Sequence, residues 1–113
     1  MNEVLIIIPA FNEEKNIVKL FEKLCVPKIR SFADILVIND GSSDSTENIA
    51  RSYDVSIITH VFNLGYGSAL QVGYKYAVRN NYNYVIQLDA DGQHSVDNIA
   101  HIYKCLTSKD ENG

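Results

Sequence analysis

Two carboxylates separated by a single residue, Asp89 and Asp91, follow a short apolar segment of the chain. Residues i and i+2 at the end of a strand point the same way, so both carboxylates can face one ligand. Two acids held this close repel each other unless a cation lies between them, and Mg²⁺ and Mn²⁺ prefer oxygen ligands. The pair therefore predicts a divalent-metal site. The alternative is that both acids cap the following helix, although Ser95 already provides a cap.

Asp40 lies in a second polar turn, which follows another apolar segment. An acid at this place can accept hydrogen bonds from a nucleobase N–H or a ribose hydroxyl. The sequence Asn-Asp-Gly-Ser is also ordinary turn chemistry, and the local pattern alone favours the plain turn. Glu13 and Glu14 have two similar interpretations, because acids in the first turn of a helix also stabilise its dipole.

Residues 63–69 form a glycine-containing segment that resembles a phosphate-binding loop only loosely. Leu70 stands where a dinucleotide fingerprint needs glycine or alanine, and no Walker lysine follows. We expect this segment, Gly67 included, to pack loop and helix closely beside a bound nucleotide. The polar residues at the strand ends form no Ser/His/Asp or Cys/His arrangement that would indicate a nucleophilic enzyme.

Alternating strands and helices must position these residues. Short apolar runs predict buried strands at residues 4–8 and 35–38, and two further strands at residues 55–59 and 84–88. Apolar residues at helical spacing predict four helices, whose buried faces comprise Ile17, Leu20, Phe21, Leu24, Thr46, Ile49, Ala50, Tyr53, Leu70, Gly73, Tyr74, Ala77, Ile99, Ile102, Tyr103 and Leu106. We expect Asn12 to cap the first helix and Pro27 to end it. Asp44 with Glu47 is expected to form a capping pair for the second helix.

Four strand–helix units in series predict an α/β fold with a Rossmann-like parallel sheet, because a crossover helix must join each pair of parallel strands. In such sheets the ligand binds outside the carboxyl ends of the strands. The length of 113 residues suits one domain. The net charge of −4 argues against a nucleic-acid partner, since such binding needs a basic face. A metal ion can still attract an anionic small molecule.

The longest apolar run, residues 4–11, is far shorter than the roughly 18 residues that indicate a membrane-spanning helix. No basic stretch precedes it, so we expect no signal peptide and a cytoplasmic location. Cys25 and Cys105 lack metal-ligand spacing, and two reduced thiols are the expectation for a reducing compartment.

Four segments together carry a resemblance that none of them carries alone. Residues 9–14, 37–44, 63–67 and 88–94 resemble the large family of inverting glycosyltransferases with the glycosyltransferase-A fold. Within that family the chain is most similar to the branch of dolichyl-phosphate mannose synthases and polyisoprenyl-phosphate glycosyltransferases. The segments occur in the family's order, and they cover nearly the whole chain.

The resemblance implies roles for individual residues. The implied substrate-binding set comprises Pro9, Ala10, Asn12, Glu13, Asp40, Gly67, Asp89, Ala90 and Asp91. Within it, Asp40 would contact the base, while Asp89 and Asp91 would hold Mn²⁺ or Mg²⁺ against the donor pyrophosphate. Gln93 would lie beside the metal ion as a further ligand. Asn39 replaces an acid that often occupies this turn in the family, so no role follows for it.

The resemblance also implies a function for the parent enzyme. Such enzymes transfer a sugar from a nucleoside-diphosphate sugar to an acceptor with inversion of configuration. The branch named above makes a polyisoprenyl phosphate the candidate acceptor. The family carries its acceptor site and general base in sequence absent here, so we expect residues 1–113 to be the donor-binding part and to be inactive in transfer. An exposed sheet edge predicts self-association of this part. The parent enzyme is expected at the cytoplasmic face of a membrane.

Three alternatives remain at this point. Phosphatases of the haloacid dehalogenase type also use an Asp-x-Asp pair, but usually after the first strand, with Thr or Val where this chain has Gln93. A calcium loop needs glycine at its sixth position and an acid at its twelfth, where this chain has His94 and Ala100. A non-catalytic nucleotide-binding module is the third alternative.

Overall fold

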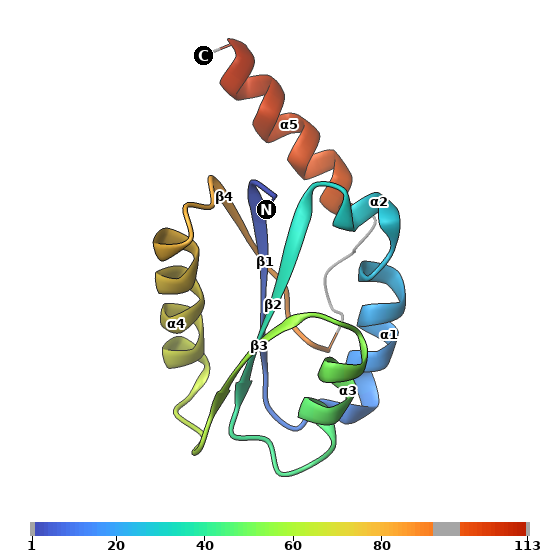
Figure 1. The fold of residues 1–113 in the computed structure, drawn as a ribbon, viewed down its shortest axis with the longest axis vertical. Helices are drawn as coiled ribbons and strands as arrows, with labels where there is room; N and C mark the ends of the chain where they lie inside the picture. The colour runs from blue at the N-terminus through green and yellow to red at the C-terminus, as the bar shows by residue number, and fades with distance from the viewer. Residues whose placement is uncertain (1, 92–97, 113) are drawn as a thin grey trace.

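The computed structural model describes residues 2–91 and 98–112, with side chains as far as Leu106. Its elements are β1 (Val4–Ala10), α1 (Glu14–Leu24), α2 (Pro27–Arg30), β2 (Ala33–Asp40), α3 (Thr46–Ser52), β3 (Ser56–His60), α4 (Tyr66–Arg79), β4 (Tyr84–Gln87) and α5 (Ile99–Asn112). The four strands form one parallel sheet in the order β3-β2-β1-β4. Helix α4 covers one face of the sheet, while α1 and α3 cover the other (Figure 1). The predicted α/β fold is therefore confirmed.

The central strand β1 divides the apolar core in two. All seven of its residues are buried. Ile6 and Ile8 pack with Phe21 on the α1 side, whereas Leu5 and Ile7 belong to the cluster on the α4 side. Successive side chains of a strand point to opposite faces, which explains why a strand covered on both faces is wholly apolar. The buried face predicted for α1 is confirmed in full.

Helix α4 approaches the sheet more closely than its sequence pattern predicts. Its buried residues are Ala69, Gly73 and Ala77, while Tyr74 is 43% exposed, contrary to prediction. A Cβ atom on Gly73 would lie 2.6 Å from Cγ2 of Ile7, so glycine is needed for this contact. The prediction for Tyr74 is wrong because small residues, and not the aromatic ring, form the packed face.

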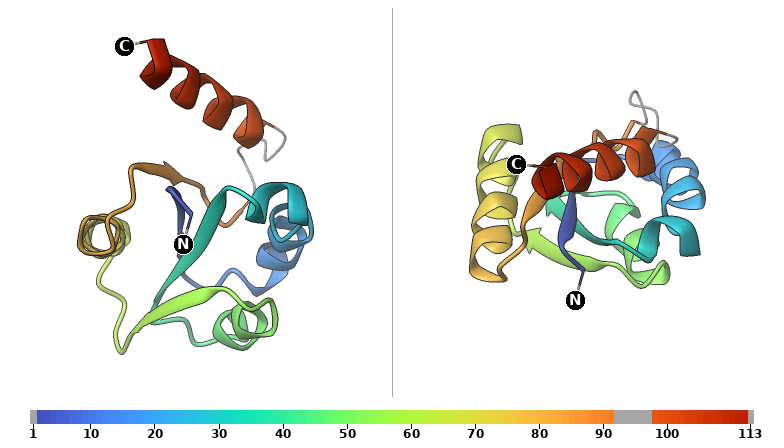
Figure 2. Two further views of the ribbon diagram at one scale, coloured as in Figure 1. Left: turned by 45° about the horizontal axis from the view of Figure 1, so that its top comes forward. Right: turned by 90° about the horizontal axis from the view of Figure 1, so that it is seen from above.

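Helix α5 begins near α2 and extends away from it (Figure 2). Ile99 is buried at its start, but Ile102 is 41% exposed, which contradicts the predicted helix face. Other predicted core residues are only half-buried, namely Ile49, Tyr53, Leu70, Tyr103 and Leu106. Within the described part of the chain, no helix combines the length and apolar character needed to cross a membrane.

Several predicted boundaries and caps also differ from the structure. Strand β2 runs on to Asp40, so the polar residues expected in a turn are the last residues of a strand. Pro27 follows the end of α1, as predicted, but it also begins a short helix, α2. The proline ring is compatible with the first turn of a helix, where its missing N–H has no partner to lose. The predicted cap Ser95 lies outside the described residues.

The predicted caps of α1 and α3 are wrong in their details. Asn12 has a φ of 52° and precedes Glu13, which occupies the N-cap position of α1. Asp44 accepts hydrogen bonds from the backbone N–H groups of Thr46 and Glu14, so it serves both helices. Glu47 does not complete a capping pair, since its carboxylate accepts from the Thr59 hydroxyl at 2.6 Å.

Candidate functional site

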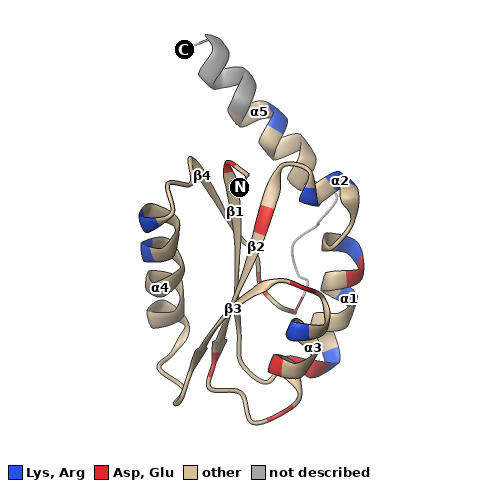
Figure 3. Cartoon of the chain, in the orientation of Figure 1, with Lys and Arg blue, Asp and Glu red and all other residues tan. Residues whose placement is uncertain are grey.

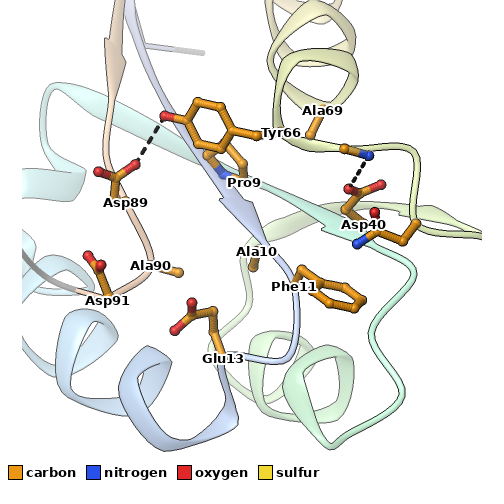
Figure 4. A pocket seen from close by; sticks show the side chains of 12 residues that line it. Pro9, Ala10, Phe11, Glu13, Asp40, Tyr66, Ala69, Asp89, Ala90 and Asp91 are labelled. Atoms are coloured by element: carbon orange, nitrogen blue, oxygen red, sulfur yellow. Dashed lines mark hydrogen bonds between the residues drawn. The ribbon is translucent and has the colours of Figure 1, made fainter.

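A cavity of about 350 Å³ lies at the carboxyl ends of β1, β2 and β4 (Figure 4). Its lining comprises Pro9, Ala10, Phe11, Glu13, Asp40, Asn63, Gly65, Tyr66, Ala69, Asp89, Ala90 and Asp91. The volume falls in the range of ordinary small-molecule sites, about 300–1,000 Å³. The cavity therefore lies where a ligand is expected in an open parallel sheet.

The cavity opens where β1 and β4 cease to pair. The register of these strands ends at Ile7 and Gln87, after which the Leu88 N–H donates to the Ile7 carbonyl at 3.0 Å. Pro9 lies two residues beyond Ile7, so its nitrogen faces the same neighbour but carries no hydrogen to donate. The ladder to β4 stops, while β1 still pairs with β2 as far as Ala10. The chain after β4 is thereby free to diverge and to line the cavity with Asp89.

Asp89 and Asp91 flank the buried Ala90 at this edge. Figure 4 shows both carboxylates on one side of the chain and the Ala90 methyl group on the other. This confirms that the i, i+2 spacing brings the two acids to the same side. Within residues 2–91 and 98–112, no group of three or more His, Cys, Asp or Glu residues could hold a metal ion. Two carboxylates suit an ion such as Mg²⁺, which commonly takes its other ligands from substrate phosphates and water.

Asp40 fastens the loop after β3 to the end of β2. Only 3% of this residue is exposed, and its two carboxylate oxygens accept hydrogen bonds from the N–H groups of Leu64 and Gly65, each at 2.9 Å. The ring of His60 lies 2.9 Å from the first of these oxygens. Burial by itself raises the pKa of Asp40, but these hydrogen bonds outweigh it and hold the pKa below its ordinary value. The carboxylate is therefore charged at neutral pH, and its observed partners belong to the protein.

Two glycines allow the loops around Asp40 to meet. Gly41 has a φ of 75°, and a Cβ atom there would lie 2.6 Å from the backbone nitrogen of Asn63. Gly65, with a φ of 102°, occupies the N-cap position of α4. Both positions favour glycine because side chains rarely tolerate this region of φ. By contrast, a Cβ on Gly67 would meet no atom within 4 Å, so close packing does not explain that glycine.

A second set of hydrogen bonds joins the start of α1 to the loop before α3. The side chain of Asn12 accepts from the Ser43 N–H at 2.8 Å, and its own N–H donates to Ser42. The Glu13 N–H donates to the Thr46 hydroxyl at 2.9 Å. Asn12 thus holds two loops together and is not among the residues that line the cavity, whereas Glu13 is.

Tyr66, the first residue of α4, reaches across the cavity to Asp89 (Figure 4). Its hydroxyl donates to the Asp89 carboxylate at 3.1 Å and accepts from the Gln87 side-chain amide at 2.6 Å. The Gln87 carbonyl oxygen accepts from the Tyr74 hydroxyl at 2.8 Å. Burial and the neighbouring Asp89 raise the pKa of Tyr66, so the phenol stays protonated and remains a donor.

Most of the predicted substrate-binding residues meet at this cavity. Those that line it are Pro9, Ala10, Glu13, Asp40, Asp89, Ala90 and Asp91. Asn12 and Gly67 do not line it, and Gln93 lies outside the described residues. The lining residues that sequence reasoning missed are Phe11, Asn63, Gly65, Tyr66 and Ala69. All five lie within or beside the segments singled out above, but nothing in their residue types indicated which of them would face the cavity.

Comparison with known proteins gives a consistent result. The family described as Glycosyl transferase family 2 matches residues 5–112. The UDP-N-acetylglucosamine–dolichyl-phosphate N-acetylglucosaminyltransferase of Methanococcus voltae is 31% identical over 116 residues, which cover 88% of this chain and 45% of that protein. The chain spans less than half the length of this and other curated relatives.

Solved structures show the same architecture. S. aureus TarS 1-349 in complex with UDP-GlcNAc has a TM-score of 0.68 at 27% identity, covering 80% of this chain and 27% of that one. The mannosyltransferase PcManGT from Pyrobaculum calidifontis in complex with GDP-Man and Mn²⁺ has a TM-score of 0.73 at 20% identity, covering 90% and 31%. The second likeness is one of fold alone.

Proposed function

The chain belongs to glycosyl transferase family 2, as its motifs predict, and we propose that its cavity binds the nucleoside diphosphate of a sugar donor together with a divalent metal ion. The observation that carries this proposal is the meeting of Asp89 and Asp91 with Pro9, Glu13 and Asp40 in one cavity. These residues come from three strand ends far apart in the sequence.

The charge of the cavity supports the proposal that a metal ion binds there. Its lining holds four acids and, among the described residues, neither lysine nor arginine. The basic residues of α4, Lys75 and Arg79, lie toward its far end, away from the cavity (Figure 3). The charged groups that a pyrophosphate would meet on this lining are all carboxylates, which repel it unless a cation lies between them. Asp89 and Asp91 are the pair placed to hold that cation.

The remaining residues would bind and orient the nucleoside. Phe11 is 46% exposed on the lining and would provide an aromatic ring for stacking with a base. Asp40 keeps the loop that carries Asn63 and Gly65 against the cavity. When bound, the metal ion would neutralise charge on the leaving nucleoside diphosphate. Asp89 and Asp91 serve that leaving group, and the general base lies elsewhere.

The donor and acceptor are proposed for the whole protein, because this chain spans less than half of its relatives. The Methanococcus voltae relative is named for UDP-N-acetylglucosamine and dolichyl phosphate, and the Mycolicibacterium smegmatis relative is a polyprenol monophosphomannose synthase. Both names support transfer to a polyisoprenyl phosphate. Inversion is proposed from the family resemblance alone. Residues 1–113 would bind donor without transferring sugar.

The test is whether metal and nucleotide strengthen each other's binding. Isothermal titration of UDP or GDP into the protein should give tighter binding with Mn²⁺ than with EDTA, and Mn²⁺ should bind more tightly with nucleotide present. This reciprocity is required by thermodynamic linkage. Asp91→Asn keeps the shape of the side chain but removes its charge, so it should abolish the coupling while the circular dichroism spectrum stays unchanged. Lack of coupling with both nucleotides in the wild-type protein would refute the proposed site.

A further inference from the structure

A chain of hydrogen bonds leads from helix α4 across strand β4 to Asp89. Tyr74 donates to the Gln87 carbonyl oxygen, Gln87 donates to the Tyr66 hydroxyl, and Tyr66 donates to Asp89. The three bonds measure 2.8, 2.6 and 3.1 Å. Tyr66 and Tyr74 stand eight residues apart on α4, so both tyrosines of this hydrogen-bond chain are held by one helix.

The direction of these bonds follows from the chemistry of the groups. A carboxamide has one acceptor end and one donor end, and Gln87 uses the acceptor end for Tyr74. Its donor end must then face Tyr66, whose single O–H is left for Asp89. Each link therefore orients the next, and the last donor points at one oxygen of the Asp89 carboxylate.

We propose that Tyr66 is a positioning residue for metal binding by Asp89, which rests on the function proposed above. An unrestrained aspartate at a chain bend samples several rotamers, and a cation must then immobilise it on binding. Tyr66 holds one carboxylate oxygen of Asp89 in place before the ion binds. Partners of this kind, which orient a metal ligand without touching the ion, usually contribute substantially to metal affinity.

The position of Tyr66 depends in turn on Asp40. Tyr66 directly follows Gly65, whose N–H is held by the Asp40 carboxylate. The buried acid at the end of β2 therefore fixes the start of α4, and the start of α4 fixes Asp89. In this way the loop after β3 links the nucleoside end of the cavity to its metal end.

Tyr66→Phe tests the proposal, because it removes the hydroxyl and keeps the ring. In the presence of saturating UDP or GDP, whichever binds wild type more tightly, Mn²⁺ binding followed by electron paramagnetic resonance should weaken about tenfold. Gln87→Met should give a smaller loss, since it removes the bonds that orient the Tyr66 hydroxyl. Tyr76→Phe is the matched control, because Tyr76 lies on the same helix and packs against Tyr82. It should bind Mn²⁺ as wild type does.

The outcomes separate this inference from the function on which it rests. If wild type shows no coupling between Mn²⁺ and nucleotide, the proposed function fails and the role of Tyr66 fails with it. If wild type shows coupling but Tyr66→Phe binds Mn²⁺ within twofold of it, the positioning role alone is refuted. Weaker nucleotide binding by Tyr66→Phe in EDTA would also refute it, since that result means a direct contact between Tyr66 and the nucleotide.

Discussion

The restraint of the β3–α4 loop by Asp40 can be tested by replacing one carboxylate oxygen of this residue. Asp40→Asn preserves the shape of the side chain, but it replaces one acceptor oxygen with an NH₂ group. Wild-type Asp40 accepts from the N–H groups of Leu64 and Gly65, one on each oxygen. In the variant one of these N–H groups would face another donor and lose its partner.

The expected cost follows from these contacts. A buried donor left without a partner costs about 1–3 kcal/mol, and hydrogen bonds to a charged acceptor are roughly twice as strong as neutral ones. Asp40→Asn should therefore lower the free energy of unfolding by about 2–4 kcal/mol. Urea denaturation measures this loss, and hydrogen exchange should show faster exchange of the Leu64 and Gly65 amides in particular.

Asp54→Asn is the matched control for this experiment. Asp54 is exposed and has a φ of 57°, a conformation that asparagine also adopts readily. The same chemical change should therefore leave the unfolding free energy within about 0.5 kcal/mol of wild type. If Asp40→Asn is equally mild and its loop amides exchange as in wild type, the carboxylate does not fasten this loop.

The sign of the pH dependence provides a second check on Asp40. Its pKa in the folded protein lies below the ordinary value of 3.8, so its charged form contributes stability above about pH 4. That contribution is lost as the pH falls through the lowered pKa of the folded state. Wild type should therefore lose stability more steeply than Asp40→Asn below pH 4, and the two proteins should converge in acid. Parallel stability curves would contradict the assignment.

Further predictions concern glycines, Asn39, thiols and assembly. Gly41→Ala should lower the melting temperature through a loss of about 2 kcal/mol, because of its positive φ and the clash with Asn63. Gly67 lies in α4, where a Cβ atom would meet open space, so Gly67→Ala should instead stabilise the folded protein by about 0.4–1 kcal/mol. A Gly41→Ala protein more stable than the Gly67→Ala protein would contradict both predictions. Asn39→Asp should lower the unfolding free energy by about 1 kcal/mol at neutral pH, because the Asn39 amide donates to Glu47 and a carboxylate would repel it. Alkylation without reductant should modify both Cys25 and Cys105, which are free in the structure, and a quantitative disulfide would count against this. Sedimentation should detect self-association through the edge strands β3 and β4, and a monomer at all concentrations would exclude it.

The fold could be predicted from the sequence because its signals are local. The apolar runs of β1 and β2 are bounded by polar residues, and α1 carries its buried residues at regular helical spacing. The α4 face was predicted only in part, since Gly73 and Ala77 are buried as expected but Tyr74 is not. The contact of α4 with the sheet requires that residue 73 has no side chain. Hydrophobic periodicity describes where apolar side chains lie, so it does not indicate where a side chain must be missing.

The site was predictable only where two residues of one short segment act together. The i, i+2 spacing of Asp89 and Asp91 is enough to predict that their side chains point to the same side of the chain. Asp89 and its hydrogen-bond donor Tyr66 are 23 residues apart in the sequence. They become neighbours only because β4 lies beside β1 and α4 packs over the same part of the sheet. That arrangement belongs to the topology, and no local pattern encodes it.

The four acids of the cavity are not equivalent, and this difference determines what the cavity can bind. Asp40 is engaged by the N–H groups of Leu64 and Gly65, so its charge mainly serves the loop. Asp89, although restrained by Tyr66, and Asp91 lie on the side where β4 has parted from β1. The end of the cavity formed by Asp89 and Asp91 therefore carries two neighbouring carboxylates. An anionic pyrophosphate would be repelled at that end without a cation, so metal binding and nucleotide binding should be inseparable there.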